Sequence, residues 1–303
     1  MPENDAIDFN RIDDILLMAI NEDLGSGDIT TEAIAEDDTT ASGQFVTRED
    51  AVVAGLPVVE RVFALVAERL ADKGRKVAAA DVRFVAKVKD GDRVKRGDVL
   101  AEIRGPALVL LGGERLALNF LQRMSGIATM TRRYVDAVKG CPAEILDTRK
   151  TTPGWRGLEK YAVRMGGGVN HRMGLYDMVL IKDNHIRIAA QRWPADDPVR
   201  RAVFEAKVRA QDTKWVEVEV GTMDQVRSAV EAGVDIIMFD NMTPDQMAEA
   251  VRLVKSSGKE ILTEASGGIT LDKIAAVAKT GIDRISIGAL THSARAVDIA
   301  LEM

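Results

Sequence analysis

The sequence predicts an α/β protein whose second half is an incomplete barrel of parallel strands. Past Gly140, short apolar segments alternate with amphipathic segments of helical periodicity, which is the pattern of repeated β-α units. The apolar segments are nearly continuous, as expected for parallel strands that are covered by helices. A polar residue or a glycine stands at the end of each one, as expected where strand ends surround a ligand.

The first part of the chain mixes helices and strands without this repeat. Apolar residues spaced three and four apart predict helices over 9–21, 57–70, 114–124 and 128–138, with an ordered turn at 28–31. Strands are predicted over 44–47 and 82–88. Two glycine-containing turns within 89–103 predict β-hairpins. This segment resembles the small barrel of biotinyl and lipoyl carrier domains. It lacks their motif around a modifiable lysine, which favours a structural role over a carrier protein.

The ends of the later strands favour a barrel over an open doubly wound sheet. Strands are predicted over 143–146, 178–181, 215–220, 236–239, 261–265 and 284–287, and helices over 157–165, 198–210, 223–232, 244–256 and 271–280. Candidate groups stand at every strand end: Asp147, Lys182, Glu219, Asp240, Ser266 to Gly268, and Gly288 with Ala289. A barrel collects ligand groups from many strands, whereas an open sheet concentrates them at one switch point. No GxGxxG motif follows a strand, which disfavours a dinucleotide-binding fold. The β-α units occupy about 170 residues, fewer than the ~250 of a full eight-fold barrel, so we expect an incomplete or distorted barrel.

Composition excludes several classes of protein. The 303 residues include 41 basic and 47 acidic side chains, for a net charge of -6, which disfavours broad nucleic-acid binding. The single cysteine, Cys141, rules out an intrachain disulfide and a thiolate-rich metal site, and a packing role is expected for it. No segment approaches the roughly 20 apolar residues of a membrane span, and residues 1–10 do not form a signal peptide. We expect a cytoplasmic enzyme.

Basic residues are concentrated in one stretch of this acidic chain. Arg149, Lys150, Arg172 and Lys182 lie within residues 147–185, together with a glycine triplet. Such a cluster predicts a pocket for a small, multiply charged anion. Two arginines can each hold a carboxylate through paired hydrogen bonds, which fits a planar dicarboxylate. The alternative is that these residues form ordinary surface ion pairs.

Two carboxylates at neighbouring strand ends, Glu219 and Asp240, are candidates for further chemistry. They can bind Mg²⁺, hold a vicinal diol, or act as acid and base. They can also do no more than balance the basic residues. Glu217 shares a face with Glu219, because side chains of a strand repeat every two residues, and the sequence leaves open which of the two enters the site.

The last two strands end in glycines that can approach a phosphate. Ser266, Gly267 and Gly268 follow one strand, and Gly288 follows the next. Glycine allows backbone N–H groups to reach phosphate oxygens, a following helix N-terminus adds a favourable dipole, and late barrel loops are a frequent phosphate site. The alternative is two tight turns without a ligand.

A zinc site is a further alternative for the histidines. His171 and His185 with Asp183 are the imaginable ligands, but three suitably spaced ligands are not evident. His171, beside Arg172, looks more like a hydrogen-bond donor to an anion.

Several long motifs, in order, resemble the quinolinate phosphoribosyltransferases, decarboxylating glycosyltransferases also called nicotinate-nucleotide pyrophosphorylases. The motifs are Asp147-Thr148-Arg149-Lys150-Thr151-Thr152-Pro153-Gly154, Gly166-Gly167-Gly168-Val169-Asn170-His171-Arg172, Leu180-Ile181-Lys182-Asp183-Asn184-His185, Glu217-Val218-Glu219-Val220 and Phe239-Asp240-Asn241-Met242. The resemblance extends from Asp28 to His292. It implies an N-terminal α/β sandwich over 1–113, joined by the tail 290–303, and an incomplete α/β barrel over 114–289.

The resemblance also implies an activity and roles for individual residues. Quinolinate and phosphoribosyl pyrophosphate would give nicotinate mononucleotide, pyrophosphate and CO₂, with Mg²⁺, in the synthesis of NAD. Quinolinate would be bound by Thr148, Arg149, His171, Arg172 and Lys182, and by Arg115 from the partner subunit of a homodimer. Lys150, Glu219 and Asp240 would act on the phosphoribosyl and pyrophosphate groups, with the last two near the metal. Ser266, Gly267 and Gly288 would bind the 5′-phosphate.

Two departures from the family pattern and one alternative function accompany this interpretation. Met165 stands where cysteine is frequent, and the segment 187–198 is longer than usual. Neither departure removes a charged group from the predicted site. The alternative is a related protein of the molybdenum-transport type with another anionic acceptor, which the retained dicarboxylate-binding cations disfavour.

Overall fold

The computed structural model describes residues 7–210 and 215–303. The chain folds into two compact units. The first comprises Met1–Arg132, Thr151–Gly167 and Leu290–Met303, and the second comprises Arg133–Lys150 and Gly168–Ala289. Residues 114–132 and 151–167, which the sequence analysis assigned to the barrel domain, therefore group with the first unit.

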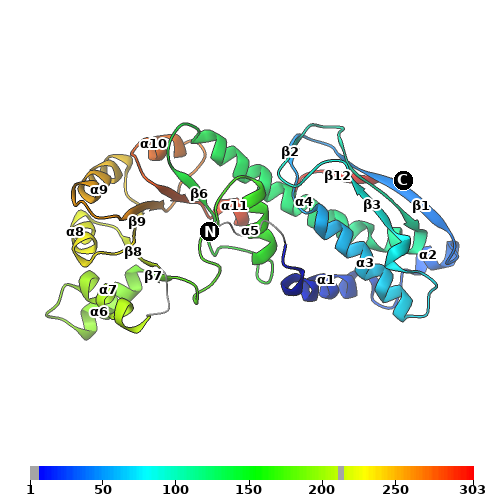
Figure 1. The fold of residues 1–303 in the computed structure, drawn as a ribbon, viewed down its shortest axis with the longest axis horizontal. Coiled ribbons are helices and arrows are strands. Elements are labelled where there is room, and N and C mark those ends of the chain that lie inside the picture. The colour runs from blue at the N-terminus through cyan, green and yellow to red at the C-terminus, as the bar shows by residue number, and fades with distance from the viewer. Residues whose placement is uncertain (1–6, 211–214) are drawn as a thin grey trace. The chain divides into compact units, whose positions relative to one another are not determined.

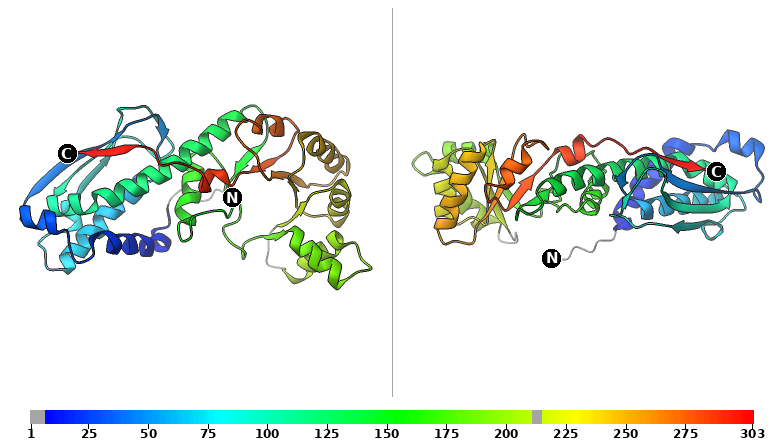
Figure 2. Two further views of the ribbon diagram at one scale, coloured as in Figure 1. Left: turned by 180° about the vertical axis from the view of Figure 1, so that it is seen from behind. Right: turned by 90° about the horizontal axis from the view of Figure 1, so that it is seen from above.

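The first unit is built on an antiparallel sheet of four strands in the order β12-β1-β5-β3. These strands are β1 (Thr40–Thr47), β3 (Arg83–Ala86), β5 (Val99–Pro106) and β12 (Ile299–Glu302). Figure 2 shows the C-terminal strand β12 running beside β1, to which it is hydrogen bonded in antiparallel register. The helices of this part of the chain are α1 (Phe9–Leu24), α2 (Ile29–Ile34), α3 (Leu56–Asp72), α4 (Ala107–Ala137), α5 (Arg156–Met165) and α11 (Ala289–His292).

Helix α4 is one continuous helix of 31 residues, so the two shorter helices predicted from the sequence were wrong in this respect. A glycine inside a helix usually weakens it. Here Gly126 allows close packing: a Cβ atom at this position would overlap the backbone carbonyl oxygen of Arg295 in the C-terminal segment. The glycine therefore marks an approach of two backbones instead of a break.

The two turns predicted within residues 89–103 are present, but their strands pair differently from hairpins. In each turn the backbone amide of a lysine donates to the carboxylate of the aspartate three residues later, from Lys89 to Asp92 and from Lys95 to Asp98, both at 2.8 Å. Strand β4 (Arg93–Val94) pairs with β2 (Ala51–Val52), while β3 pairs with β5. Likewise, the turn predicted at 28–31 is the capped start of α2, where Asp28 accepts from two backbone amides.

The second unit contains six parallel strands in the order β6-β11-β10-β9-β8-β7, which confirms the predicted parallel sheet. The strands are β6 (Glu144–Leu146), β7 (Val179–Ile181), β8 (Val216–Val220), β9 (Ile236–Asp240), β10 (Leu262–Ser266) and β11 (Arg284–Ser286). The helices are α6 (Asp183–Arg192), α7 (Pro198–Arg209), α8 (Met223–Ala232), α9 (Pro244–Ser256) and α10 (Ile274–Ala278). Helix α6 was not predicted. Figure 1 shows α8 and α9 on the outer side of β8 and β9.

The register of the sheet assigns its polar residues to one face. Glu219 pairs in register with Met238, Ser266 with Asp240, and Glu264 with Arg284, and partners in register lie on the same face. The intervening residues of β8, Val216, Val218 and Val220, are buried and pack toward the helices. Burial of each such side chain contributes about 1.5–3 kcal/mol. The apolar core thus lies between sheet and helices, and the inner face is left for polar chemistry.

None of the described helices has the length and apolar character that crossing a membrane requires.

Candidate active site

The second unit brings most of the predicted site residues to the carboxyl ends of its strands. Lys182 directly follows β7, while Asp240 and Ser266 are the last residues of β9 and β10. Thr148, Arg149 and Lys150 follow β6, and Gly288 follows β11. Glu219 lies one residue before the end of β8. Arg115 belongs to the first unit, where it is exposed on α4.

Lys182 forms an ion pair with Glu219 across the neighbouring strands β7 and β8. The lysine side chain is 45% exposed and the glutamate side chain 13% exposed, so the pair sits at the boundary between sheet interior and solvent. A solvated cation next to a half-buried carboxylate can exchange its protein partner for a ligand anion.

Arg172 is half-buried, and its guanidinium donates to the backbone carbonyl of Met178 through Nη1 at 3.1 Å. Burial lowers the pKa of Arg172, and the positive charge of Arg149 lowers it further, while the charges of Glu217 and Asp177 oppose this. Arg149 and Arg172 are therefore close enough to repel each other. A ligand with two negative charges would relieve that repulsion.

Glycine is required at the turn after β10. Gly267 has φ 95°, and a Cβ atom there would overlap the side chain of Asn241. Asn241 itself adopts the left-handed region with φ 54°, and its amide donates to the Asp240 carboxylate at 2.9 Å. The turn therefore holds Asp240 and Ser266 side by side, as their pairing in register requires.

The helix dipole expected behind these glycines is weak in this structure. Helix α10 begins only at Ile274, and α11, which directly follows Gly288, has four residues. Phosphate binding at this place would therefore depend on backbone N–H groups of the loops, without the help of a long helix.

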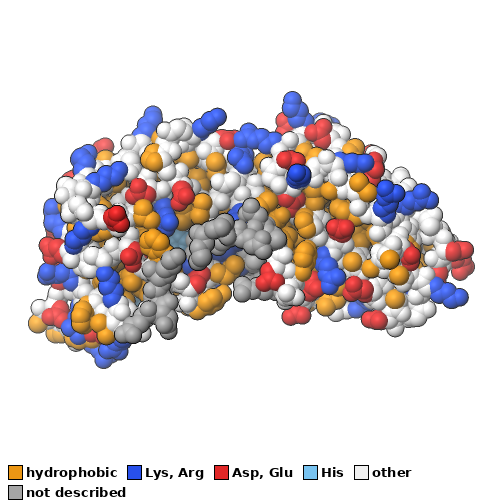
Figure 3. All heavy atoms as spheres, viewed as in Figure 1, with side chains coloured by type: hydrophobic (Ala, Val, Ile, Leu, Met, Phe, Trp, Pro, Cys, Tyr) orange, Lys and Arg blue, Asp and Glu red, His pale blue; other side chains and the backbone are white. Residues whose placement is uncertain are grey.

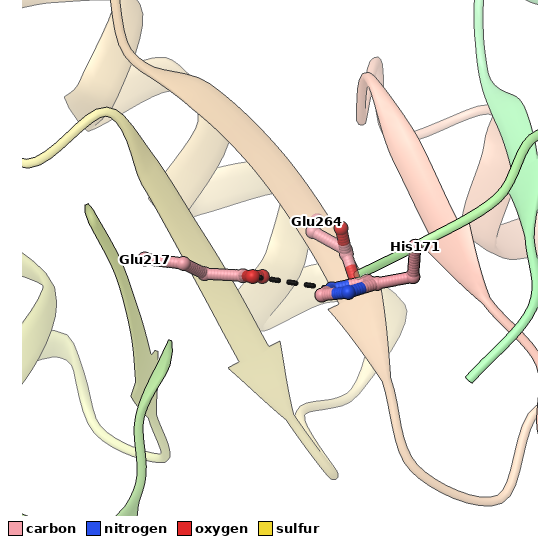
Figure 4. Close-up of side chains that lie close together, drawn as sticks. All are labelled: His171, Glu217 and Glu264. Carbon is pink, nitrogen blue, oxygen red and sulfur yellow. Dashed lines mark ion pairs between the residues drawn. The ribbon is translucent and has the colours of Figure 1, made fainter. Parts of the chain in front are cut away.

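His171 lies between two fully buried glutamates on the inner face of the sheet, as Figure 4 shows. Its Nε2 atom is 3.1 Å from Oε2 of Glu217 on β8 and 3.5 Å from Oε1 of Glu264 on β10. The ring is only 8% exposed. The other ring nitrogen, Nδ1, accepts the backbone N–H of Arg172 at 2.7 Å. Both ring nitrogens are thus engaged inside the protein.

This cluster retains an additional proton near neutral pH. Burial lowers the pKa of His171, but hydrogen bonds to Glu217 and Glu264 prevail and raise it to about 9. Burial, followed by the charge of Glu264, raises the pKa of Glu217 to about 7. A protonated imidazole disagrees with the acceptor role of Nδ1. We therefore place the proton on Glu217, because a neutral carboxyl is the cheaper buried form and the total charge of the cluster is the same.

Two buried carboxylates of this site, Glu264 and Asp147, were not assigned a role from the sequence. Glu264 was hidden inside the predicted apolar strand 261–265, and its Oε1 accepts the hydroxyl of Ser286 on β11. Asp147, also fully buried, accepts from the backbone N–H of His171 at 2.9 Å and from the amide of Asn170 at 2.6 Å. The available signal was an acidic residue within a strand whose neighbours are apolar, because such residues are rarely buried without partners.

Glu217 and Glu219 differ in how deeply each is buried. Both lie on the inner face, but Glu217 is fully buried against His171, whereas Glu219 lies nearer the strand end and pairs with Lys182. Glu219 is therefore the one available to a ligand at the mouth of the sheet.

The zinc ligands imagined from the sequence do not meet. His185 is exposed, and its Nδ1 accepts the backbone N–H of Lys182 at 2.8 Å, where it caps the first turn of α6. Among the described residues, the group with potential metal-ligand geometry is His171, Glu217 and Glu264, whose ligand atoms lie within 4.8 Å of one another. A magnesium ion prefers oxygen ligands and retains water and substrate phosphates, which fits the partly exposed Glu219 and Asp240 better than this buried group.

Charge on the remaining surface is mixed. On the face drawn in Figure 3, the basic side chains of the described residues are interspersed with acidic ones over both units.

Comparison with known proteins decides the family. The family model for the quinolinate phosphoribosyl transferase C-terminal domain matches residues 127–302, and the model for the N-terminal domain matches residues 28–125. The chain belongs to the quinolinate phosphoribosyl transferase family. It is 42% identical over 282 residues to the probable nicotinate-nucleotide pyrophosphorylase [carboxylating] of Bacillus subtilis, covering 93% of this chain and 90% of that one.

Other members of the family agree along nearly the full length. The nicotinate-nucleotide pyrophosphorylase [carboxylating] of Mycobacterium leprae is 40% identical, with 98% of each chain covered. The crystal structure of NadC from Streptococcus pyogenes superposes with a TM-score of 0.88 at 40% identity, again over 98% of each chain. The fold class predicted from the sequence is thereby confirmed. These relatives carry no molybdenum-transport name, so that alternative is not retained.

Proposed function

We propose that this protein transfers a phosphoribosyl group from phosphoribosyl pyrophosphate to quinolinate, with loss of CO₂, to give nicotinate mononucleotide and pyrophosphate in the synthesis of NAD. The observation that carries the proposal is the placement of two arginines in a member of this family: Arg149 follows strand β6, and Arg172 is half-buried with its guanidinium held by the carbonyl of Met178, just before strand β7. A pyridine with two adjacent carboxylates offers each of the two guanidinium groups a carboxylate partner.

The substrate-binding role is assigned to residues around this pair. Arg149 and Arg172 would hold the two carboxylates, and the exposed ammonium of Lys182 would leave Glu219 to join them. Thr148 follows β6 and directly precedes Arg149. Its hydroxyl accepts the backbone N–H of Lys150 at 3.0 Å, which stabilises the turn that carries Arg149 and Lys150. His171 accepts the backbone N–H of Arg172 and so holds the loop that carries this arginine.

Lys150, Glu219 and Asp240 are assigned to the phosphoribosyl and pyrophosphate groups. The two carboxylates are close to neighbouring strand ends on one face, where they would hold ribose hydroxyls or a Mg²⁺ ion. Mg²⁺ bound there would neutralise charge on the departing pyrophosphate. Backbone N–H groups near Ser266, Gly267 and Gly288 would receive the 5′-phosphate.

The chain's residues act mainly by positioning two anions that repel each other. The ring nitrogen attacks the anomeric carbon, the C–O bond to pyrophosphate breaks, and Lys150 stabilises the negative charge that the leaving group gains. The pyridine nitrogen is now cationic. The bond to the adjacent carboxylate then breaks, its electron pair remains on the ring carbon beside that nitrogen, and this carbon takes up a proton as CO₂ leaves.

The proposal includes that the protein forms a homodimer and acts in the cytoplasm. Arg115 is exposed on α4 and would enter the site of the partner subunit. A closed two-fold dimer would then contain two such shared sites.

The test is mass-spectrometric detection of nicotinate mononucleotide from quinolinate, phosphoribosyl pyrophosphate and Mg²⁺. Nicotinate in place of quinolinate is the matched control, because it has no second carboxylate for the arginine pair. Product from quinolinate alone supports the proposal. Equal turnover of nicotinate, or no product from quinolinate, contradicts it.

A further inference from the structure

We propose that Glu217 and Glu264 are positioning residues of this reaction: together they hold the imidazole of His171, and through it the loop that carries Arg172, in the orientation that receives the pyridine dicarboxylate. The inference rests on the proposed function for the identity of the substrate. Neither glutamate is among the residues that the family resemblance assigns to substrate, pyrophosphate or metal.

The backbone and the ring of His171 are held by different groups. Asp147, at the end of β6, accepts the backbone N–H of His171 and the side-chain amide of Asn170. This fixes where the loop leaves the sheet but not how the ring is turned. The ring direction is set separately by the two glutamates at its Nε2 atom.

The glutamates are themselves rigidly placed. Glu217 is the second residue of β8, and Glu264 is the middle residue of β10, so their backbones are fixed by strand pairing on both sides. Ser286 on β11 donates its hydroxyl to Glu264. Within the described part of the chain, the contact between Oε2 of Glu217 and Nε2 of His171, at 3.1 Å, is the polar contact that orients the Glu217 carboxyl. Residues from β8 and β10 thus contact one ring, and Ser286 of β11 holds one of them in place.

The ring in turn supports Arg172. Nδ1 of His171 accepts the Arg172 backbone N–H at 2.7 Å, so a rotation of the ring would release the backbone of the arginine. The guanidinium is anchored to the carbonyl of Met178 at 3.1 Å. Loss of the two glutamate contacts to His171 should therefore weaken binding of the dicarboxylate, with little effect on the binding of phosphoribosyl pyrophosphate.

Matched substitutions of one position separate this role from simple packing. Glu217→Gln keeps the shape and an oxygen that accepts from Nε2–H, whereas Glu217→Leu keeps a similar volume but has no acceptor. Thr263→Val is the structural control: Thr263 is buried beside Glu264, but its hydroxyl donates to Asp283 at 2.6 Å. That control should lower the melting temperature and leave the KM for quinolinate unchanged.

The kinetic expectation is a split between the two substrates. Glu217→Leu should raise the KM for quinolinate by about tenfold or more, the size of effect expected from one hydrogen bond at a charged site. The KM for phosphoribosyl pyrophosphate should stay within about twofold, and Glu217→Gln should restore the quinolinate KM to within about threefold of wild type. A wild-type KM in the leucine variant, or equal impairment of both variants, overturns the proposal.

A second measurement needs neither turnover nor a variant that folds. Nitrogen-15 NMR of the His171 ring in the ligand-free wild-type protein should show one fixed tautomer with the proton on Nε2. Ring signals averaged between tautomers, or a stoichiometric metal ion bound at Nε2, would overturn the positioning role. If the wild-type protein makes no nicotinate mononucleotide but the ring has the one fixed tautomer, the proposed function is wrong. The role of the two glutamates in orienting His171 is then still supported.

Discussion

The ammonium of Lys182 and the carboxylate of Glu219 pair with each other where strands β7 and β8 end. In the proposed function each residue acts on a different substrate, so the pair would join the pyridine side of the site to the phosphoribosyl side. In the absence of ligands, each group has the other as its counter-charge.

A double-mutant cycle on this pair should therefore show strong coupling. We expect Lys182→Ala to reduce kcat/KM for quinolinate, and Glu219→Ala to act mainly on phosphoribosyl pyrophosphate. Combined, their effects on the free energy of the transition state should depart from additivity by about 0.5–3 kcal/mol, as for residues in contact. Steady-state kinetics of the four proteins gives the coupling. Strict additivity would contradict a shared role.

Arg172→Ala should abolish most of the activity while the protein remains folded. Two charged hydrogen bonds to a carboxylate would be lost, which corresponds to a fall in kcat/KM of about a hundredfold to ten-thousandfold. Arg172→Lys should recover part of the loss, because a lysine restores the charge without the paired geometry. Normal turnover in the alanine variant, with unchanged circular dichroism, would disprove the site assignment.

Subunit complementation tests the assignment of Arg115. Arg115→Ala and Arg172→Ala are each expected to be inactive as homodimers, but a mixed dimer contains one site with both arginines. Random reassociation should then recover roughly a quarter of wild-type activity in a two-fold dimer. Activity that stays at the level of the separate variants would show that Arg115 does not cross to the partner.

The His171 cluster predicts a loss of stability with rising pH. The additional proton of the cluster lies on Glu217, whose pKa is raised from 4.5 to about 7 by burial and by the charge of Glu264, so the folded state binds more protons than the unfolded state between those values. The stabilisation is fully present below pH 4.5 and is lost as pH rises through about 7, with a slope of at most about 1.4 kcal/mol per pH unit. Denaturant unfolding of wild type and Glu217→Gln at several pH values measures the difference. An equal pH dependence of both proteins would refute it.

Two glycines in helices should respond oppositely to alanine. Gly126→Ala places a Cβ atom against the Arg295 carbonyl and should lower the free energy of unfolding by about 1–3 kcal/mol. Gly157→Ala in α5 meets nothing nearer than 3.8 Å and should raise it by about 0.5–1 kcal/mol, since alanine favours the helix. Denaturant melts of the two variants provide the comparison. Equal effects would show that the tail does not pack against α4 in this way.

The local pattern of the chain was sufficient for much of this protein. The β-α repeat predicted the parallel strands and most of their helices, because burial of one strand face under helices leaves a periodic trace in the sequence. The pattern of strand ends likewise placed Lys182 and Asp240 where the strands end. The long motifs predicted the family, which the matching family models confirm.

Tertiary structure decided what depends on residues far apart along the chain. Only the register of β8, β10 and β11 brings Glu217, Glu264 and Ser286 around His171, and the sequence shows Glu264 merely as an acidic residue in an apolar strand. The continuity of α4 through Gly126 depends in the same way on a tail that is distant in sequence. The helix or strand propensity of a residue reports only the free-energy cost of a local conformation. Tertiary packing decides which group offsets a buried charge or fills the space beside a glycine.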